Sequence, residues 1–460
     1  MIKIVNQFFK GHKRTVKAKK NIIASFFIKG INIIIGFLMV RITLEYLDQT
    51  KYGIWLTLTS IIGWVSFFEL GLGGGLKNRL AVSLAKNDSH LAKTYVSTTY
   101  AILAIIILAV TIIFFFANTF IDWTKILNTD ASYANELSIL VLIIFNFFFI
   151  QFVLNLISII LKADQRPALG DSFLTIGRLI TLILVFLLIK STISTNTTTG
   201  SLIYLGWILS ASPVLVLLVA SIYLFNTDYK EIRPSINYVK FEYAKDLLNL
   251  GIKFFFIQIS MIIIFQSSII IIAQFYGPAE VTPYYIAQRL FSVIMLTFTI
   301  VASPFQVAFT EAWVQKDIIW VKNIVKKLFI LWICLVFLAF ILYLISDPFF
   351  NAWIGKEKMK TILISNKLKI SIVISVLLFS LGGVFNMFIN GVAKVSVQMY
   401  CHLIGAIIFI PVTYFFIEYL HWGIESVVIG GIIANFYYTI IAPIQYYKIL
   451  NNKAHGIWNK

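Results

Sequence analysis

The chain has 460 residues, of which 59% are hydrophobic and 13% are charged, whereas an average soluble protein has about 25% charged residues. With a mean hydropathy of +0.89, this composition excludes a soluble domain and indicates an all-α polytopic membrane protein. A net charge of +18 is typical of a nucleic-acid-binding protein. Most of the basic residues, however, lie between the apolar runs, where they determine the orientation of a chain in its membrane.

Twelve apolar runs are candidates for transmembrane helices, each near the length of about 20 residues that a bilayer requires. In chain order they cover residues 21–44, 52–69, 91–117, 136–161, 170–189, 201–225, 251–276, 285–311, 327–345, 368–391, 395–417 and 424–445. No cleavable signal peptide is recognisable, so the first run is expected to remain as a helix. Cys334 and Cys401 lie in separate runs without CxxC spacing, so neither a metal site nor a redox pair is indicated.

Basic residues alternate in density between successive loops. With the N-terminus inside, most Lys and Arg residues fall on that side, and the positive-inside rule then places both termini and the segment 226–249 in the cytoplasm. The loop 347–369 is basic yet expected outside.

The first two runs carry polar residues within the apolar sequence. Lys29 and Arg41 lie inside the first run, and Lys29 shares a helical face with Asn32 and Gly36. A second, softer polar line in the next run is formed by Thr59, Gly63 and Ser66.

The second run ends in a glycine-rich segment, ELGLGGGLKNRLA, over residues 69–81. The glycines are expected to break the helix, with residues 76–84 lying amphipathically on the membrane. The spacing matches neither GxxxxGK[ST] nor GxGxxG after a strand, so a phosphate-binding loop is rejected.

The seventh and eighth runs carry the most regular polar faces. In the seventh, polar residues recur every seven positions and so lie on one side of a helix: Lys253, Ser260, Ser267 and Gln274. In the eighth, one side contains Arg289, Ser292, Thr299, Ser303, Gln306 and Thr310, with a kink expected at Pro304. Hydrocarbon penalises charge, so these faces are expected to line a wet cavity. The alternative is that Ser and Thr join neighbouring helices and that Lys253 reaches the interface from its helix end.

The remaining polar residues within spans have simpler explanations. Arg178 is expected to serve bundle structure or to reach the headgroups, and a buried structural role is expected for His402 rather than a proton relay. Glu69 and Glu311 end the second and eighth runs on the inner side. They are candidates for ion coupling, although interfacial carboxylates commonly have no such role.

The sequence pattern restarts halfway along the chain. YLDQTKYG at residues 46–53 has a counterpart in YGPAEVTPY at 276–284, and VLNL at 153–156 has one in VFNM at 384–387. The common offset predicts a parallel repeat of six helices per half. The expected segments are a cytoplasmic N-terminus (1–20), a first bundle (21–225), a cytoplasmic linker (226–249), a second bundle (250–447) and a cytoplasmic C-terminus (448–460).

The ELGLG segment at residues 69–73, with the small and Lys/Asn/Arg residues that follow it, resembles the end of the second helix in Wzx-type polysaccharide (O-antigen) repeat-unit flippases. These proteins belong to the multidrug/oligosaccharidyl-lipid/polysaccharide exporter superfamily. The resemblance implies two six-helix bundles around a central cavity that is lined by the first, second, seventh and eighth helices. It also implies that the protein works by alternating access.

The leading functional hypothesis is therefore a flippase in the bacterial inner (cytoplasmic) membrane. Its substrate would be an undecaprenyl-diphosphate-linked oligosaccharide for surface polysaccharide, either O-antigen or capsule. Arg289 is expected to be the principal anion-binding residue, assisted by Lys29 and Arg41, because guanidinium groups bind diphosphate through paired hydrogen bonds. Expected partners are this glycan, membrane lipids, a polysaccharide polymerase and other assembly proteins, without nucleic acid. No cofactor is expected, and proton or sodium coupling is left open.

Two other functions fit the sequence less well. A multidrug or cation exporter of the same superfamily would be better served by buried carboxylates, and few acidic residues lie deep within a span. A membrane enzyme of the same pathway needs carboxylates or histidines clustered on a sizeable loop, whereas residues 118–135 and 346–366 offer only scattered ones. The chain is accordingly expected not to be an enzyme.

Overall fold

The apolar runs form helices in a computed structural model, which describes residues 13–64, 67–194, 200–244 and 252–459. No strand occurs in these ranges. The helices up to the linker are α2 (Lys13–Tyr46), α3 (Gln49–Gly63), α4 (Phe67–Ala85), α5 (Ser89–Asn118), α6 (Trp123–Leu127), η2 (Ala131–Tyr133), α7 (Ala134–Leu154), α8 (Leu156–Ala163), α9 (Pro167–Ser194) and α10 (Leu202–Asn226).

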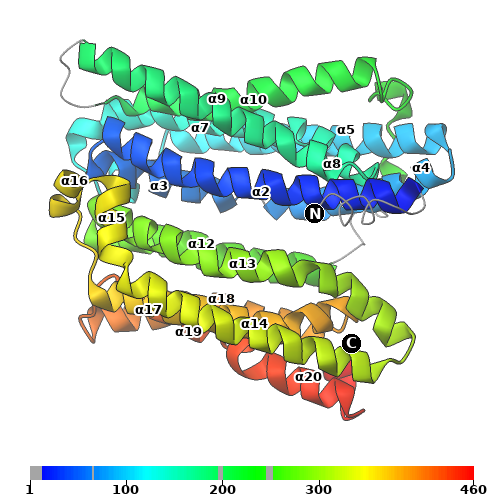
Figure 1. The fold of residues 1–460 in the computed structure, drawn as a ribbon. Coiled ribbons are helices and arrows are strands. Elements are labelled where there is room, and N and C mark those ends of the chain that lie inside the picture. Colours follow the sequence, from blue (N-terminus) through cyan, green and yellow to red (C-terminus); the bar gives the residue numbers. More distant parts are fainter. Residues whose placement is uncertain (1–12, 65–66, 195–199, 245–251, 460) are drawn as a thin grey trace, which may run out of the picture. The chain divides into compact units, whose positions relative to one another are not determined.

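The linker contains two short 3₁₀ turns, and the second half is again helical (Figure 1). Their elements are η3 (Ile236–Tyr238), η4 (Phe241–Tyr243), α12 (Ile252–Tyr276), η5 (Pro278–Glu280), α13 (Val281–Val314), α14 (Ile318–Leu344), α15 (Ser346–Ile354), α16 (Lys356–Thr361), α17 (Asn366–Gly391), α18 (Ser396–Glu418), α19 (Glu425–Ala434), η6 (Tyr437–Ile441), α20 (Ala442–Leu450) and η7 (Gly456–Asn459). Residues 1–12 and 245–249 of the predicted N-terminal and linker segments lie outside the described residues.

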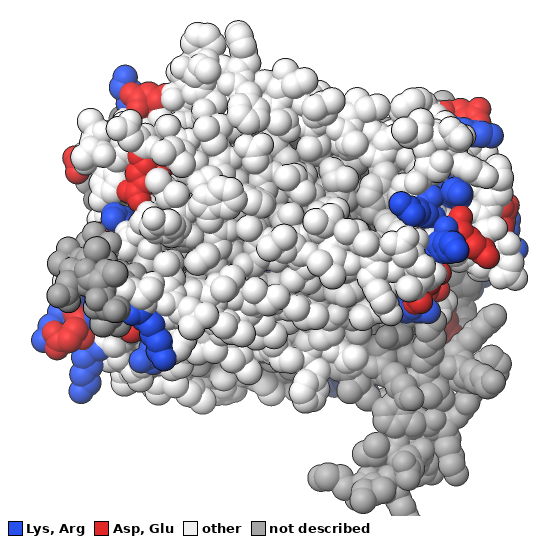
Figure 2. Space-filling model, turned by 90° about the horizontal axis from the view of Figure 1, so that it is seen from above, with Lys and Arg blue, Asp and Glu red and all other residues white. Residues whose placement is uncertain are grey.

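The helices confirm the predicted all-α polytopic class. Among the described residues, 10 helices are long and apolar enough to cross a membrane, and a bent pair in the last predicted span, Glu425–Ala434 with Tyr437–Leu450, raises the number to 11. Large apolar side chains face outward, as at Phe27 and Phe116, which are 74% and 72% exposed. In Figure 2 the charged residues gather near the helix ends and leave a wide uncharged band between them. Such a surface suits lipid rather than water.

Contacts between Cα atoms divide the chain into two compact units. The first contains residues 1–48, 68–126 and 130–252, and the second contains residues 49–67, 127–129 and 253–460. Helix α3 therefore packs with the second unit, although it precedes most of the first unit in the sequence.

Close helix packing in the first unit depends on glycine. A side chain at Gly170 would meet the Ser158 carbonyl oxygen at 2.8 Å, and one at Gly177 would meet Pro213 at 2.8 Å. Helix α9 thereby approaches α8 and α10 closely. Phe114 and Phe145 stack with their ring centroids 4.2 Å apart and fill the space between α5 and α7.

Helix α17 is the central helix of the second unit and contacts α13, α14, α19, η6 and α20. Gly383 lets the Phe298 ring approach, since a side chain there would meet it at 2.5 Å. Farther along, the Phe309 and Phe388 rings join α13 to α17 at 5.6 Å between centroids. Both of these rings are completely buried.

The predicted helix break at the glycine cluster was wrong, because α4 continues through these glycines to Ala85. A glycine in a helix costs about 1 kcal/mol relative to alanine. Packing supplies the compensation here, since Leu76 and Leu80 are fully buried. The chain instead turns at Asn87, whose φ of 54° lies in the left-handed region.

Candidate functional site

The polar line predicted on α12 is partly buried within the second unit. Ser260 and Ser267 are 0% and 5% exposed, and the Ser260 hydroxyl donates to the Phe256 carbonyl oxygen at 2.8 Å. The Lys253 ammonium donates to the Ser396 hydroxyl of α18 at 2.8 Å. Gln274, at the far end of α12, is exposed. In this conformation Lys253 therefore joins two helices and is only partly exposed.

The polar line on α13 is more accessible. Ser303 is exposed and Gln306 is half-buried. Ser292 and Thr299 are half-buried and donate to backbone carbonyl oxygens of their own helix at 2.8 Å each. The helix is continuous through Pro304. The amide and hydroxyl groups on this face of α13 can therefore form hydrogen bonds with a bound molecule.

Arg289 is half-buried on α13, close to the contact between α13 and α3. One turn before it, Tyr285 meets Tyr52 of α3 edge to face, with ring centroids 6.2 Å apart. The Arg289 guanidinium lies near enough to the Tyr52 phenol for the two to interact electrostatically. Arg289 therefore lies beside the aromatic contact that joins α13 to α3.

The position of α3 is determined by the turn before α13. The Gln49 amide donates to the Ala279 carbonyl oxygen at 3.0 Å, and the Thr282 hydroxyl donates to the Gln49 carbonyl oxygen at 2.8 Å. A side chain at Gly53 would overlap the Pro278 carbonyl oxygen. Only glycine permits this approach, so α3 and η5 are held backbone to backbone.

Helix α2 carries the two other predicted cations, and both Lys29 and Arg41 are exposed. Asn32, on the same face as Lys29, is engaged with α9: its amide nitrogen donates to Thr175 at 2.7 Å, and its oxygen accepts from Arg178 at 3.0 Å. Arg178 thus serves bundle structure, which is one of the two roles predicted for it.

Of the two carboxylates predicted for ion coupling, the structure describes the side chain of one. Glu311 is exposed near the end of α13 and accepts a hydrogen bond from Gln315 at 3.4 Å. Glu69 belongs to α4, but its side chain lies outside the described residues. Neither observation tests a role in coupling.

A polar hollow of about 610 Å³ lies in the first unit, and no residue lining it was predicted as part of a site. Its walls are the turns that follow α4, α8 and α10: Leu84, Asn87, Asp88, Ser89, Asp164, Arg166, Thr227, Asp228, Tyr229, Lys230, Glu231 and Ile232. The turns share one end of the unit, the end that the positive-inside rule predicts to face the cytoplasm. The signal available in the sequence was the presence of charges of both signs after the second, fourth and sixth predicted spans.

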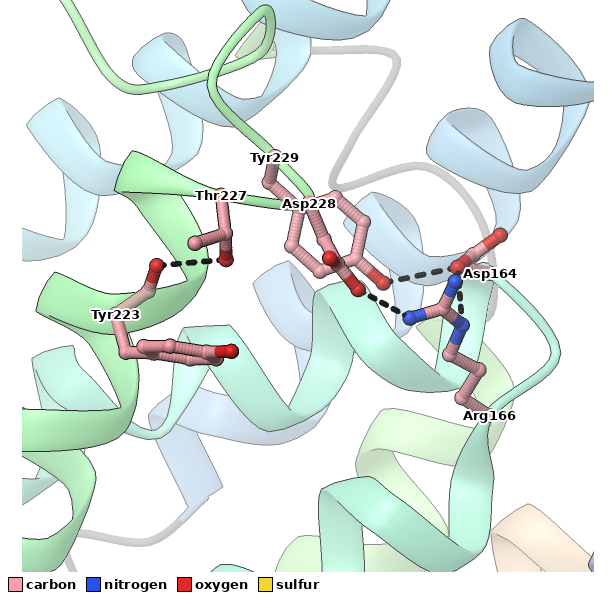
Figure 3. Close-up of polar contacts among 6 residues, drawn as sticks. All are labelled: Asp164, Arg166, Tyr223, Thr227, Asp228 and Tyr229. Carbon is pink, nitrogen blue, oxygen red and sulfur yellow. Dashed lines mark hydrogen bonds and ion pairs between the residues drawn. The ribbon is translucent and has the colours of Figure 1, made fainter.

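Arg166 organises this hollow (Figure 3). Its guanidinium pairs with Asp164 at 3.0 Å and with Asp228 at 2.5 Å, and the Tyr229 phenol donates to Asp164 at 2.9 Å. Burial, and then the neighbouring Asp164 carboxylate, raise the pKa of Tyr229, so its phenol stays protonated and keeps donating. The start of the linker is thereby attached to the α8–α9 turn.

The linker is also attached farther along. The Ser235 amide donates to the Ser97 hydroxyl at 3.1 Å, and the Lys240 amide donates to the Thr98 hydroxyl at 3.0 Å. Both hydroxyls belong to α5 of the first unit. Residues 227–243 therefore form part of that unit.

The comparisons with known proteins agree with this fold. Residues 18–309 match the family described as "Polysaccharide biosynthesis protein". Among solved structures, the chain is similar to an inward-facing multidrug resistance MATE family transporter of the MOP superfamily, with a TM-score of 0.73, 14% identity and coverage of 92% of this chain and 96% of that one. An outward-facing structure of such a transporter gives a TM-score of 0.63 at 14% identity, with 98% of each chain covered.

A MOP superfamily transporter from Pyrococcus furiosus, described as having a binding pocket of reverse polarity, gives a TM-score of 0.60 at 15% identity, with 98% of each chain covered. The search of curated proteins found no match. At these identities the solved structures show the fold alone, and the family match covers more than half of the sequence. The chain therefore belongs to the polysaccharide biosynthesis protein family.

Proposed function

We propose that this transporter is a flippase for an undecaprenyl-diphosphate-linked oligosaccharide. The observation that carries the proposal is the sign of the charges within its membrane helices. Arg289 is half-buried in α13, and Lys29 and Arg41 are exposed on α2. Among the described residues, the carboxylates of the long helices lie near helix ends, as Glu136, Asp171 and Glu311 do.

Positive charge inside a membrane protein selects for an anionic substrate. A charged side chain within a span costs about 2.5–3.5 kcal/mol on an insertion scale. A diphosphate would offset that cost through charge-assisted hydrogen bonds, and the hydroxyl and amide groups of α13 would bind sugar hydroxyls. A cationic drug would gain nothing from these residues, which disfavours the cation exporter.

The proposal includes a location and a cycle. The transporter would lie in the bacterial inner membrane with both termini in the cytoplasm, and it would work by alternating access. Arg289, Lys29 and Arg41 would be substrate-binding residues. Partners would be the lipid-linked glycan, a polysaccharide polymerase and other assembly proteins. Coupling to protons or sodium through Glu69 and Glu311 remains a prediction.

The test is complementation in a strain that lacks its own repeat-unit flippase and makes a defined polysaccharide. We expect expression of this chain to restore surface polysaccharide and to lower the accumulated lipid-linked oligosaccharide. A matched variant, Lys125→Ala, removes an exposed cation from the short helix α6 and should restore both as the unmodified chain does. Drug efflux is measured in the same cells. Drug resistance without surface polysaccharide, in strains making several different repeat units, would contradict the proposal and favour the exporter.

A further inference from the structure

His402 is the most unusual polar residue of the second unit. It lies on α18 and is 0% exposed, and neither of its ring nitrogens has a hydrogen-bond partner among the described residues. A buried structural histidine normally has at least one satisfied nitrogen, and each unsatisfied buried polar atom costs about 1–3 kcal/mol. The purely structural role that the sequence predicts does not explain why both ring nitrogens lack a partner.

Two tyrosines of the bent last span enclose this imidazole. The ring centroids of Tyr437 and Tyr438 each lie 5.3 Å from that of His402. The Tyr437 phenol is directed to other groups, Asn386 at 3.4 Å and Gln445 at 3.3 Å. His402 is therefore packed between rings without an acceptor for an added proton.

The span that carries these tyrosines is irregular where it meets His402. Helix α19 ends at Ala434, the π-helix η6 begins at Tyr437, and the two halves of the span meet at an angle of 47°. π-Helical turns frequently occur at functional sites. The Asn435 side-chain oxygen in this break and the Gln398 side-chain oxygen one turn before His402 are also buried without a described partner.

Charge and packing are incompatible at this position. A protonated imidazole buried without an acceptor pays a desolvation penalty larger than the roughly 2 kcal/mol that a desolvated cation gains from an aromatic ring. The titratable groups that face His402 are the phenols of Tyr437 and Tyr438, and the Cys401 thiol is its neighbour in the chain. Within the described residues His402 forms no ion pair that would stabilise its positive charge.

We propose that His402 is a proton-binding site that controls the packing of the bent span: it is neutral while α18 lies against η6, and it binds a proton when α19–α20 moves away and water reaches the imidazole.

The contact between the two spans is suited to such a separation. At Gly405 a side chain would overlap the Ala434 carbonyl oxygen, so the helices meet there through backbone rather than interlocked side chains. The break and the π turn interrupt the regular helix at the point where the proposed shift of α20 would begin.

The experiment measures the distance between α18 and α20 at two proton concentrations. Spin labels are attached at Tyr400→Cys and Tyr447→Cys, both exposed positions, in a full-length chain with Cys334→Ser and Cys401→Ser. The protein is studied in lipid nanodiscs at about pH 8 and about pH 5, on either side of the ordinary imidazole pKa of about 6.5. We expect acidification to move the mean distance by about 2 Å or more, within the range of known helix shifts.

His402→Phe keeps a ring between the tyrosines but cannot bind a proton, and we expect it to lose the pH-dependent shift. His402→Gln, which is uncharged and can form hydrogen bonds, should lose the shift as well and carries the test if the phenylalanine variant does not fold. His421→Phe changes an exposed histidine beyond α18 and should keep the shift. A distance independent of pH in the parent chain, or an undiminished shift in either His402 variant, would overturn the proposal. Since transport is not measured, the outcome is independent of the proposed substrate.

Discussion

Arg289 supplies the most specific prediction at the scale of single residues. Replacing it with alanine removes the half-buried charge of α13, and replacing it with lysine keeps the charge but loses the planar fork that binds a diphosphate through two hydrogen bonds. A hydrogen bond to a charged group contributes about 1.5–3 kcal/mol. We therefore expect Arg289→Ala to lower surface polysaccharide by roughly 10-fold or more, and Arg289→Lys to lower it less, at matched expression.

The measurement is surface polysaccharide in the flippase-deficient strain, with membrane content determined in parallel. Lys125→Ala is again the control. Undiminished output from Arg289→Ala would remove Arg289 from the site, and full activity of Arg289→Lys alone would indicate a cation that only reaches the interface.

The sequence predicts which residues are unusual within a span but not which residues they contact. The presence of Arg289, Lys29 and Arg41 within apolar runs was visible without coordinates, because charge in a span is costly enough to be conspicuous. The partner of Arg178 was not visible: Asn32 is 146 positions away on another helix. Helical periodicity predicts which residues share a face but not which helix that face meets.

Among the elements, the contact between α3 and η5 makes a sharp prediction. Any side chain at Gly53 overlaps the Pro278 carbonyl oxygen, whereas one at Gly74 of α4 meets nothing within 4 Å. Overpacking costs about 1–3 kcal/mol, and alanine in place of an unconstrained helical glycine gains about 0.5–1 kcal/mol. Gly53→Ala should therefore lower the thermal unfolding midpoint in detergent, and Gly74→Ala should leave it unchanged or raise it. Equal midpoints for the two variants would show that α3 does not pack as described.

Some helix boundaries could be predicted from the sequence and others could not. Apolar length placed the long spans well, since α5 (Ser89–Asn118) covers the predicted 91–117 and α17 (Asn366–Gly391) the predicted 368–391. It was misleading at the glycines of α4, where buried leucines outweigh low helix propensity. The bend between α19 and α20 was missed, because no proline or glycine marks Asn435 and its neighbour Phe436.

At the scale of the whole molecule, the docked linker can be tested through Arg166. Arg166→Ala leaves the Asp164 and Asp228 carboxylates without their shared cation, so the start of the linker should detach more often. We expect trypsin to cut after the exposed Lys230 roughly threefold to tenfold faster, corresponding to a loss on the order of 1 kcal/mol. Lys162→Ala breaks a comparable ion pair with Asp171 that does not involve the linker and serves as the control. Unchanged cleavage in Arg166→Ala would show that Arg166 does not retain the linker.

The orientation of the molecule in its membrane yields a second prediction at this scale. The basic linker should face the cytoplasm, because Lys and Arg are retained on that side. Lys240→Cys should therefore resist a membrane-impermeant maleimide in intact cells and react after lysis, in a chain without its two native cysteines. Lys125→Cys, in a loop predicted outside, should react in intact cells. Labelling of Lys240→Cys from outside would reverse the predicted topology.

The assignment of α3 to the second unit has a consequence for how the protein is made. Its partners in η5 and α13 are separated from it by about 230 residues of sequence, as the Gln49–Ala279 hydrogen bond shows. At a synthesis rate of about 5–20 residues per second, α3 leaves the ribosome roughly 10–50 s before those partners exist. During that interval the bilayer, an insertase or another helix must accommodate Gln49 and the glycine face around Gly53. The order in which the helices enter the membrane therefore differs from the order in which they pack, and slowing translation between α10 and α12 should lengthen the time during which nascent chains are open to membrane proteases.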